Sequence, residues 1–289
     1  MTTSDSSRPA VGRVPSAFAT APADSPKREA RRRLDSAGDA TKPDHTARVL
    51  LVLGGTSDIG RATALAFAED GWTIQLAGRD LDALQREADD IATRTGVTVS
   101  VHRFDVLDTP SFPAFVDALP ALPQTVVCVV GLLGEQARAQ DDPDHAATVM
   151  RTNYEGPALV LGLLANRFLQ RGHGTIVGVS SVAGDRGRAS NYVYGSAKAG
   201  FSAFLSGLRN RTASSGVHVL TVKPGFVRTR MTRGMALPGA LTASPTLVGQ
   251  QIRDAATKRK DVVYIYPSWR LIMGVIKAIP EGVFKKKKL

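Results

Sequence analysis

The stretch that decides the fold is VLLVLGGTSDIG at residues 49–60. Its five leading aliphatic residues predict a short strand, and the glycines after them predict a tight turn into a helix over residues 59–70. Glycines in such a turn let a ligand approach the backbone, and the N–H groups at a helix start attract a pyrophosphate. The same kind of turn also occurs in α/β proteins that bind no nucleotide, so its meaning depends on the rest of the chain.

Apolar strands and helical patterns alternate downstream of this turn. We expect strands at residues 72–77, 97–104, 125–130, 174–180, 217–222 and 262–266, and helices at 81–95, 111–119 and 145–171. A further helix carries Tyr194 and Lys198 and ends at about residue 214. Residues 230–260 are looser and carry no predicted element. This alternation indicates one α/β domain with a parallel sheet covered on both faces, in a doubly wound Rossmann-type arrangement.

The two ends of the chain differ from this central part, which spans residues 47–268. Residues 1–46 are rich in Ser, Ala, Pro, Arg and Asp and predict a disordered N-terminal extension. They have no apolar core of a secretory signal, and an overlong start-site assignment would also explain them. Residues 269–289 are an apolar and basic C-terminal segment, in which an eleven-residue apolar run precedes Lys285 to Lys288.

The apolar run of the C-terminal segment is too short to span a bilayer, which needs about 20 residues. Together with the lysines it favours peripheral contact with a membrane surface. Packing on the domain or on a partner subunit is the alternative.

Composition excludes several classes of protein. The 289 residues carry a formal charge of +11, of which residues 1–46 contribute +2 and the four terminal lysines +4. No nucleic-acid motif accompanies this charge, and we expect no nucleic-acid partner. The single cysteine, Cys128, lies in an apolar run and is expected to be buried, so neither a disulfide framework nor a metal site is predicted. A reducing, cytoplasmic compartment fits best.

Three residues further along the chain suggest catalysis. Tyr194 and Lys198 are spaced i and i+4, so a helix presents both to the same ligand, and Ser181 precedes them after an apolar strand. A neighbouring ammonium stabilises a phenolate, so we expect Lys198 to lower the pKa of Tyr194 toward neutrality. Tyr192 and Ser180 are weaker candidates, because of the spacing to Lys198 and because Ser180 should face the core.

The order of glycine-rich turn, serine, Y-x-x-x-K and Pro224-Gly225 resembles the short-chain dehydrogenase/reductase family over residues 49–229. This resemblance implies an enzyme that reduces a ketone to an alcohol. Tyr194 would be the general acid, Ser181 would orient the carbonyl, and Lys198 would also bind the nicotinamide ribose. Asn153 matches a fourth member that positions a water for proton relay.

The resemblance also implies a cofactor site. The family pattern T-G-x-x-x-G-x-G places Asp58 where a glycine is usual, and we expect this carboxylate to turn away or to cap the helix. Arg79 follows the second predicted strand and favours NADP(H) over NAD(H), because a guanidinium can bind a 2′-phosphate. If Arg79 is merely solvated, both cofactors are used. The implied cofactor-binding residues are Gly54, Thr56, Ser57, Asp58, Ile59, Gly60, Arg79, Asp105, Val106, Gly131, Tyr194, Lys198, Pro224, Gly225, Val227 and Thr229.

Within the family, the strings GGTSDIG, GLLG, NYVYGSAKAG and RTRM resemble the reductase subunit of decaprenylphosphoryl-ribose 2′-epimerase. That resemblance implies a 2-keto polyprenylphosphoryl pentose as substrate, a flavoprotein oxidase partner and a location at the inner face of the plasma membrane. A homodimer or homotetramer is expected. Arginines after the catalytic serine and after the Pro-Gly turn would bind the substrate phosphate, foremost Arg186, Arg188 and Arg230.

Two other functions stay open on sequence grounds. The first is a soluble reductase of small ketones or 3-oxoacyl groups. The second is a non-catalytic Rossmann-type binding protein, against which the complete set of Ser, Tyr, Lys and Asn argues.

Overall fold

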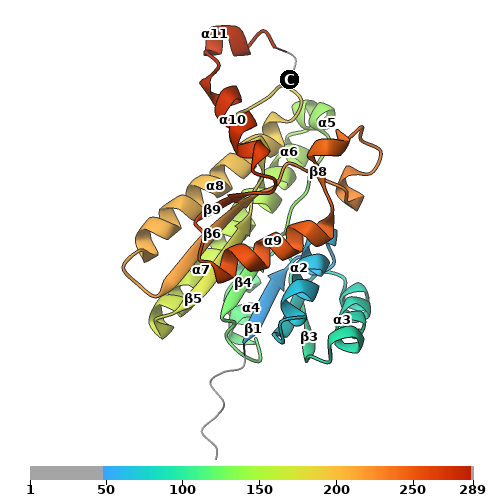
Figure 1. Ribbon diagram of the computed structural model, residues 1–289, viewed down its shortest axis with the longest axis vertical. Coiled ribbons are helices and arrows are strands. Elements are labelled where there is room, and N and C mark those ends of the chain that lie inside the picture. The colour runs from blue at the N-terminus through green and yellow to red at the C-terminus, as the bar shows by residue number, and fades with distance from the viewer. Residues whose placement is uncertain (1–47, 288–289) are drawn as a thin grey trace, which may run out of the picture. The chain divides into compact units, whose positions relative to one another are not determined.

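The computed structural model describes residues 48–287, so the expectations for residues 1–46 and for Lys288 lie outside it. A seven-stranded sheet, parallel in every pairing, has the order β3-β2-β1-β4-β5-β6-β9 (Figure 1). Its strands are β1 Val49–Leu53, β2 Thr73–Gly78, β3 Val99–Arg103, β4 Thr125–Cys128, β5 Gly174–Val179, β6 Val217–Lys223 and β9 Val262–Tyr264. The strand order reverses between β1 and β4, and in such sheets ligands bind beyond the carboxyl ends of the strands at that point.

Helices cover both faces of the sheet. Apolar residues of α2 (Asp58–Ala68), α3 (Leu81–Thr95) and α9 (Pro245–Thr257) pack into one core cluster. Residues of α4 (Phe112–Asp117), α7 (Gly156–Arg171) and α8 (Tyr192–Thr212) pack into a second cluster. Both clusters contain fully buried residues of the central strands. The predicted doubly wound Rossmann-type fold is therefore confirmed.

The helix expected at residues 145–171 is interrupted. The helix α6 (Pro143–Met150) follows the short α5 (Gln136–Asp141), and a π-helical turn, Arg151–Glu155, then separates α6 from α7. Asn153 lies in this turn. Apolar periodicity cannot distinguish a π turn from an α turn, so the sequence pattern predicted one continuous helix across residues 151–155. Such turns are rare and frequently mark functional sites.

Residues 230–260 contain a regular helix, contrary to the looser pattern expected there. α9 begins after Ser244, whose side chain accepts a hydrogen bond from the Leu247 N–H, and Pro245 occupies the first helical position. Its Gly249 packs so closely on α2 that a Cβ would lie 2.5 Å from the Ala62 carbonyl. The Ser-Pro pair is a recognised helix start, so this signal was present in the sequence.

The C-terminal segment packs on the domain. In α10 (Ser268–Ala278), Trp269 and Met273 are buried in a small core cluster with Val182, while α11 (Glu281–Phe284) follows at the end of the described chain (Figure 1). Gly225 lies directly against the indole, because a Cβ there would be 2.1 Å from Trp269 Cε2. No helix within residues 48–287 is long and apolar enough to cross a membrane.

Candidate active site

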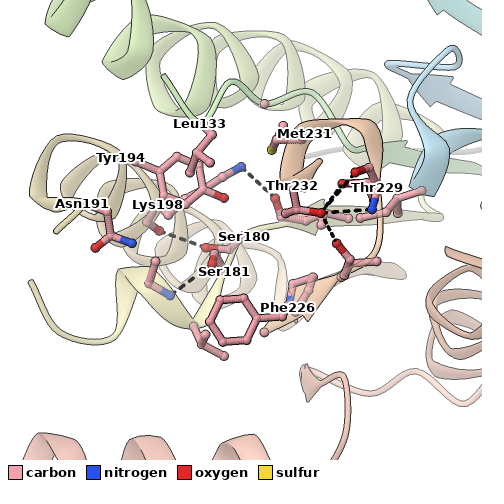
Figure 2. A pocket seen from close by; sticks show the side chains of 18 of the residues that line it. Leu133, Ser180, Ser181, Asn191, Tyr194, Lys198, Phe226, Thr229, Met231 and Thr232 are labelled. Carbon is pink, nitrogen blue, oxygen red and sulfur yellow. Dashed lines mark hydrogen bonds between the residues drawn. The ribbon is translucent and has the colours of Figure 1, made fainter. Parts of the chain in front are cut away.

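A cavity, called here the catalytic cavity, lies beyond the carboxyl ends of β4, β5 and β6. Figure 2 shows Ser181, Tyr194 and Lys198 together on one side of it, with Met231 across from them. Ile59, Gly131, Pro224, Gly225, Val227 and Thr229, expected at the cofactor, also line it. The structure therefore brings together residues from widely separated parts of the chain.

Ser181 follows β5 and begins a short 3-10 turn, Val182–Gly184. Its Oγ accepts a hydrogen bond from the Ala183 N–H at 3.1 Å, which fixes the hydroxyl at the edge of the cavity. The Val182 N–H donates to the Pro224 carbonyl at 3.0 Å, so the serine turn is tied to the Pro-Gly turn. Ser180 faces α8 instead, where its hydroxyl bonds the Lys198 carbonyl at 3.0 Å.

Tyr194 and Lys198 lie in the first two turns of α8. The Lys198 ammonium donates to the Val179 carbonyl at 3.1 Å and lies 5.8 Å from the Tyr194 ring centroid. Burial raises the pKa of Tyr194 to about 12, and a hydrogen bond with Ser181 offsets this only in part. Burial also lowers the pKa of Lys198 to about 8.

The expected lowering of the Tyr194 pKa by Lys198 is therefore not what the structure shows. Desolvation penalises the phenolate more than its neighbours stabilise it. As a result Tyr194 holds its proton at neutral pH.

Asn153 is fully buried in the π turn and fastens the loop after β4. Its Nδ2 donates to the carbonyls of Leu132 at 2.6 Å and Val149 at 2.8 Å. Its Oδ1 accepts from the Leu132 N–H at 3.2 Å. Both amide N–H groups are used by backbone carbonyls, so the side chain has no donor left to hold a relay water.

A second groove lies next to the catalytic cavity, on the β2 and β3 side of the sheet. It is lined by Gly54, Thr56, Ser57, Arg79, Val106 and Gly131 of the expected cofactor residues. Gly54 has a φ of +95°, which suits glycine, and a Cβ on Gly60 would lie 2.4 Å from the Gly54 carbonyl. The turn is thus built for close backbone approach at a helix N-terminus, which fits a dinucleotide pyrophosphate.

Two acidic residues near this groove have local structural roles. Asp105 Oδ1 accepts from the Leu107 N–H at 3.0 Å and shapes its own turn. Asp80 caps α3 by accepting from the Ala83 N–H at 2.9 Å, as expected for a residue that begins that helix. Arg79 is exposed at the groove wall, where it remains the candidate reader of the 2′-position.

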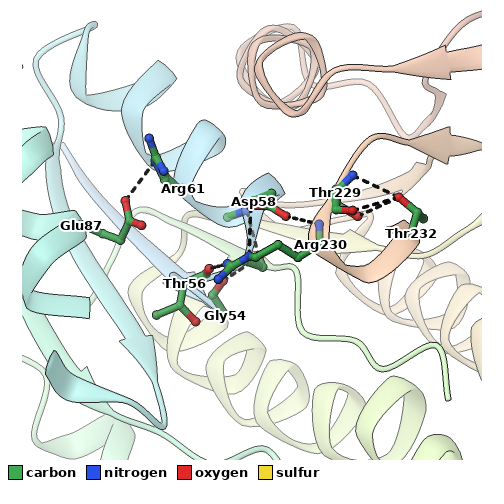
Figure 3. Close-up of polar contacts among 10 residues, drawn as sticks. Gly54, Thr56, Asp58, Arg61, Glu87, Thr229, Arg230 and Thr232 are labelled. Atoms are coloured by element: carbon green, nitrogen blue, oxygen red, sulfur yellow. Dashed lines mark hydrogen bonds and ion pairs between the residues drawn. The ribbon is translucent and has the colours of Figure 1, made fainter. Parts of the chain in front are cut away.

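Asp58 pairs with an arginine that is 172 residues away (Figure 3). Its Oδ2 accepts from the Arg230 backbone N–H at 2.7 Å, and its Oδ1 lies 3.3 Å from the Arg230 Nε. The guanidinium also donates to the Thr56 carbonyl. The helix cap expected of Asp58 is supplied by Ser57, whose Oγ accepts from the Gly60 N–H at 3.0 Å. Asp58 instead ties the turn to the segment after β7 (Phe226–Val227).

The three arginines expected at the substrate separate in the structure. Arg186 donates to the carbonyls of Ile276, Lys277 and Ile279 and pairs with Glu281 at 2.7 Å. Arg186 caps the C-terminal carbonyls of α10. Its guanidinium is therefore engaged there, and its assignment to the substrate was wrong. Arg230 is engaged at the cofactor turn. Arg188 alone lines the catalytic cavity.

Sequence reasoning missed three residues that line the cavities at Tyr194. Asn191, just before α8, and Trp269 in α10 line the catalytic cavity. Gln136 at the start of α5 lines a third cavity, which shares Arg188, Asn191 and Tyr194 with the catalytic cavity. A lone amide or indole has no motif that would mark it. Their places in these cavities are a product of the tertiary fold.

Comparisons with known proteins identify the family of the chain. The sequence profile of the family described as short chain dehydrogenase matches residues 48–237. An uncharacterized oxidoreductase of Mycobacterium tuberculosis (strain ATCC 25618 / H37Rv) is 36% identical over 246 residues, covering 84% of this chain and 98% of that protein. An uncharacterized oxidoreductase of Streptomyces coelicolor is 38% identical over 253 residues, covering 86% and 98%.

Solved structures extend the similarity of fold. A short-chain dehydrogenase from Sphingobium yanoikuyae in complex with NADPH superposes with a TM-score of 0.70 at 21% identity, over 81% of this chain and 97% of that chain. The two sequence relatives are named as oxidoreductases without a substrate. The finer resemblance to the epimerase reductase subunit therefore gains no support from them.

Proposed function

Because the chain belongs to the short-chain dehydrogenase family and is an NAD(P)-dependent oxidoreductase, we propose that it reduces a ketone to an alcohol with Tyr194 as the proton donor. The observation that carries this proposal is the shared cavity of Ser181, Tyr194 and Lys198, which adjoins the glycine-lined groove. A non-catalytic binding role would not require a buried phenol beside an ordered serine hydroxyl.

Tyr194, Ser181 and Lys198 would each have a different role at the substrate carbonyl. Tyr194, with a pKa raised to about 12, keeps its proton until the carbonyl oxygen becomes basic enough to take it. Ser181 donates a second hydrogen bond to the same oxygen and orients it. Lys198 places a positive charge near the phenol, which opposes the rise in negative charge as the proton leaves.

The groove residues would hold the dinucleotide, whose nicotinamide supplies the hydride when bound. The turn at residues 54–60 offers backbone N–H groups to the pyrophosphate, and Arg79 favours a 2′-phosphate, hence NADP(H). Thr229 and Val227 line the catalytic cavity on the side expected for the nicotinamide amide.

The test is turnover by the purified full chain with NADPH and NADH across a panel of ketones. Tyr194→Phe should lower kcat by roughly 10²- to 10⁴-fold, because a general acid is lost, while NADPH affinity stays within a few-fold. Retention of most of kcat would contradict the assignment of Tyr194. Oxidation of the matching alcohols in the reverse direction would show which carbonyl compounds fit.

A lipid-linked keto-sugar is a second candidate substrate, favoured by the outer face of α10. Leu271 and Val275 there are 73% and 61% exposed, and Arg270 and Lys277 flank them. An exposed apolar strip with basic flanks suits an anionic membrane surface, on which a polyprenyl-linked substrate would reside. A flavoprotein partner and a homodimeric or homotetrameric assembly remain predictions from the sequence resemblance. Turnover of a polyprenylphosphoryl keto-pentose in vesicles, compared with soluble 3-oxoacyl substrates, separates this candidate from the soluble one.

A further inference from the structure

Three buried polar atoms beside Tyr194 have no hydrogen-bond partner within the described residues. They are Gln136 Nε2, Arg188 Nε and Asn191 Oδ1. The other such atoms belong to Gln75 on β2 and His218 on β6, which do not line the cavities near Tyr194. A buried polar group without a partner loses its hydrogen bonds to water and gains none in return, so a cluster of them at a cavity wall indicates a ligand site.

The three residues, called here the polar subsite, come from two segments of the chain and line one cavity that opens onto Tyr194. Gln136 begins α5, Arg188 lies in the loop after Ser181, and Asn191 precedes α8. Arg188 and Asn191 also line the catalytic cavity, where Figure 2 shows Asn191 beside Tyr194. A molecule reacting at Tyr194 can therefore reach the polar subsite.

A hydrogen bond to the amide oxygen of Gln136 fixes the orientation of this side chain. Gln136 Oε1 accepts a hydrogen bond from the Val193 N–H at 3.1 Å, which leaves Nε2 as the group directed elsewhere. The Asn191 amide can offer its own N–H to a ligand after a half-turn about its terminal bond. With that half-turn, the polar subsite provides three donor groups along one cavity.

Arg188 gives the polar subsite a positive charge, and no ion pair neutralises this charge within the described residues. Within residues 48–287, no carboxylate lies within ion-pairing distance of Arg188. Asp185 nearby is occupied by Lys223 at 2.5 Å and by the Tyr264 hydroxyl at 2.7 Å, and Glu135 is exposed at the rim of the cavity. Arg188 is half-buried, and burying a guanidinium without a counter-charge is costly. An anion in the cavity would relieve this cost.

The remaining walls shared by the two cavities are apolar, with Leu133, Phe226 and Met235 facing the space between Tyr194 and Arg188. The lining suits a molecule with a carbonyl at one end, a short apolar part, and a negatively charged oxygen group at the other.

We propose that Gln136 and Arg188, supported by Asn191, form an oxyanion-binding subsite, and that the substrate is a ketone bearing a carboxylate or a phosphate. This inference rests on the proposed ketone reduction and deepens it by naming the substrate class. It assigns substrate recognition to Arg188 rather than to Arg186 or Arg230. A guanidinium with a second amide donor is a strong receptor for either oxyanion.

Matched substrate pairs test the proposal with NADPH and the full chain. Acetoacetate is compared with ethyl acetoacetate, and dihydroxyacetone phosphate with dihydroxyacetone. The wild type should prefer the charged member of at least one pair, and the preferred pair tells carboxylate from phosphate. Arg188→Met should lower kcat/KM for that charged substrate roughly ten- to a hundredfold more than for its neutral counterpart, since a charge-assisted hydrogen bond is lost.

Two further variants sharpen this result. Arg188→Lys should recover part of the preference because it restores the charge, and Gln136→Ala should weaken the preference less than Arg188→Met does. Arg233→Met is the matched control, because Arg233 lies outside the residues that line the two cavities. An equal charged-to-neutral ratio in the wild type and in Arg188→Met would overturn the proposal.

A binding measurement separates this inference from the proposed reaction. Thermal unfolding of the wild type with acetoacetate and with dihydroxyacetone phosphate should show, for at least one of the two anions, a stabilisation that Arg188→Met loses and Arg233→Met keeps. If no ketone is reduced but this stabilisation is seen, the ketone reduction fails and the oxyanion site stands. If neither anion stabilises the wild type and neither is preferred as a substrate, the oxyanion site is rejected.

Discussion

The carboxylate of Asp58 accepts the backbone N–H of Arg230 at 2.7 Å and lies 3.3 Å from its guanidinium Nε. Asp58 occupies the helix N-terminus of the turn that would hold a pyrophosphate, where a lone carboxylate would repel the phosphates. Its pairing with Arg230 makes the local charge close to neutral. The pair also fastens the segment that contains Thr229 and Met231, which borders both the groove and the catalytic cavity.

This pairing predicts a non-additive effect on cofactor affinity. Arg230→Met should raise the Kd for NADPH more in the Asp58 background than in an Asp58→Asn background, because only the former leaves an unpaired carboxylate. The Arg230 side chain is 61% exposed, so the coupling should be modest, about 1 kcal/mol or roughly fivefold. Titration of NADPH fluorescence measures the Kd, and Arg233→Met serves as control. Additive effects would show that the ion pair does not act on the cofactor.

Burial of Lys198 predicts a pH-dependent stability difference. Its pKa is lowered to about 8, so between pH 8 and the usual value of about 10.5 the unfolded chain binds more protons than the folded one. The Lys198 contribution therefore rises with pH in this window and is least favourable below pH 8. Relative to Lys198→Met, the wild type should gain ~2 kcal/mol of unfolding free energy between pH 7 and pH 9.5.

Urea unfolding at the two pH values measures this difference, and Lys258→Met, at an exposed lysine, is the control. The window ends before pH 10 because the raised pKa of Tyr194 acts in the opposite direction above it. A constant difference between Lys198→Met and the wild type would mean that Lys198 keeps an ordinary pKa in the folded protein.

Arg79 predicts the cofactor preference. Arg79→Asp should shift the ratio of kcat/KM from NADPH toward NADH, because it removes a partner for the 2′-phosphate and adds an acceptor for the 2′-hydroxyl. Charge-assisted hydrogen bonds of this kind contribute about 1.5–3 kcal/mol. Steady-state kinetics with both cofactors measures the ratio. Arg94→Asp, at the far end of α3, should leave it unchanged. The same ratio in Arg79→Asp and the wild type would show that Arg79 does not contact the 2′-position.

The close contact between Gly225 and Trp269 predicts strong steric coupling. A Cβ on residue 225 would lie 2.1 Å from the indole, so Gly225→Ala must displace either the Pro-Gly turn or α10. Overpacking of this kind typically costs about 1–3 kcal/mol, and kcat/KM should fall with it. Trp269→Leu should make Gly225→Ala much less costly in the double variant. Chemical unfolding of the wild type, the two single variants and the double variant gives the coupling free energy between the two positions. Additive changes in the free energy of unfolding would contradict the packing described.

The outer face of α10 predicts membrane association that can be tested without removing the helix. Deleting residues from 268 onward should destabilise the domain, because Trp269 and Met273 are buried and Arg186 binds the helix end. Leu271→Glu with Val275→Glu should instead leave folding intact while reducing sedimentation with anionic vesicles at low salt. Leu159→Glu is a control, since Leu159 is 51% exposed on α7. Equal sedimentation of all three proteins would reject the membrane contact.

The sequence by itself determined the fold class, and it predicted the catalytic set. Strand and helix periodicity, the glycine-rich turn and the Y-x-x-x-K spacing depend on local backbone geometry, which neighbouring residues encode directly. The helix α9 was also signalled, by Ser244 and Pro245, although the looser pattern around it obscured the signal. Expected roles for Ser181 and Tyr194 follow from their order along the chain.

The tertiary structure alone decided which side chain contacts which. Arg186 and Arg188 are two positions apart, yet one closes the end of α10 and the other lines the catalytic cavity. Asp58 and Arg230 are partners across 172 residues, and no local pattern announces the pairing. The pKa of Tyr194 moved opposite to expectation, because the effect of burial outweighs that of the hydrogen bond with Ser181. Charge pairing and desolvation depend on distances between remote segments, and those distances arise only when the chain folds.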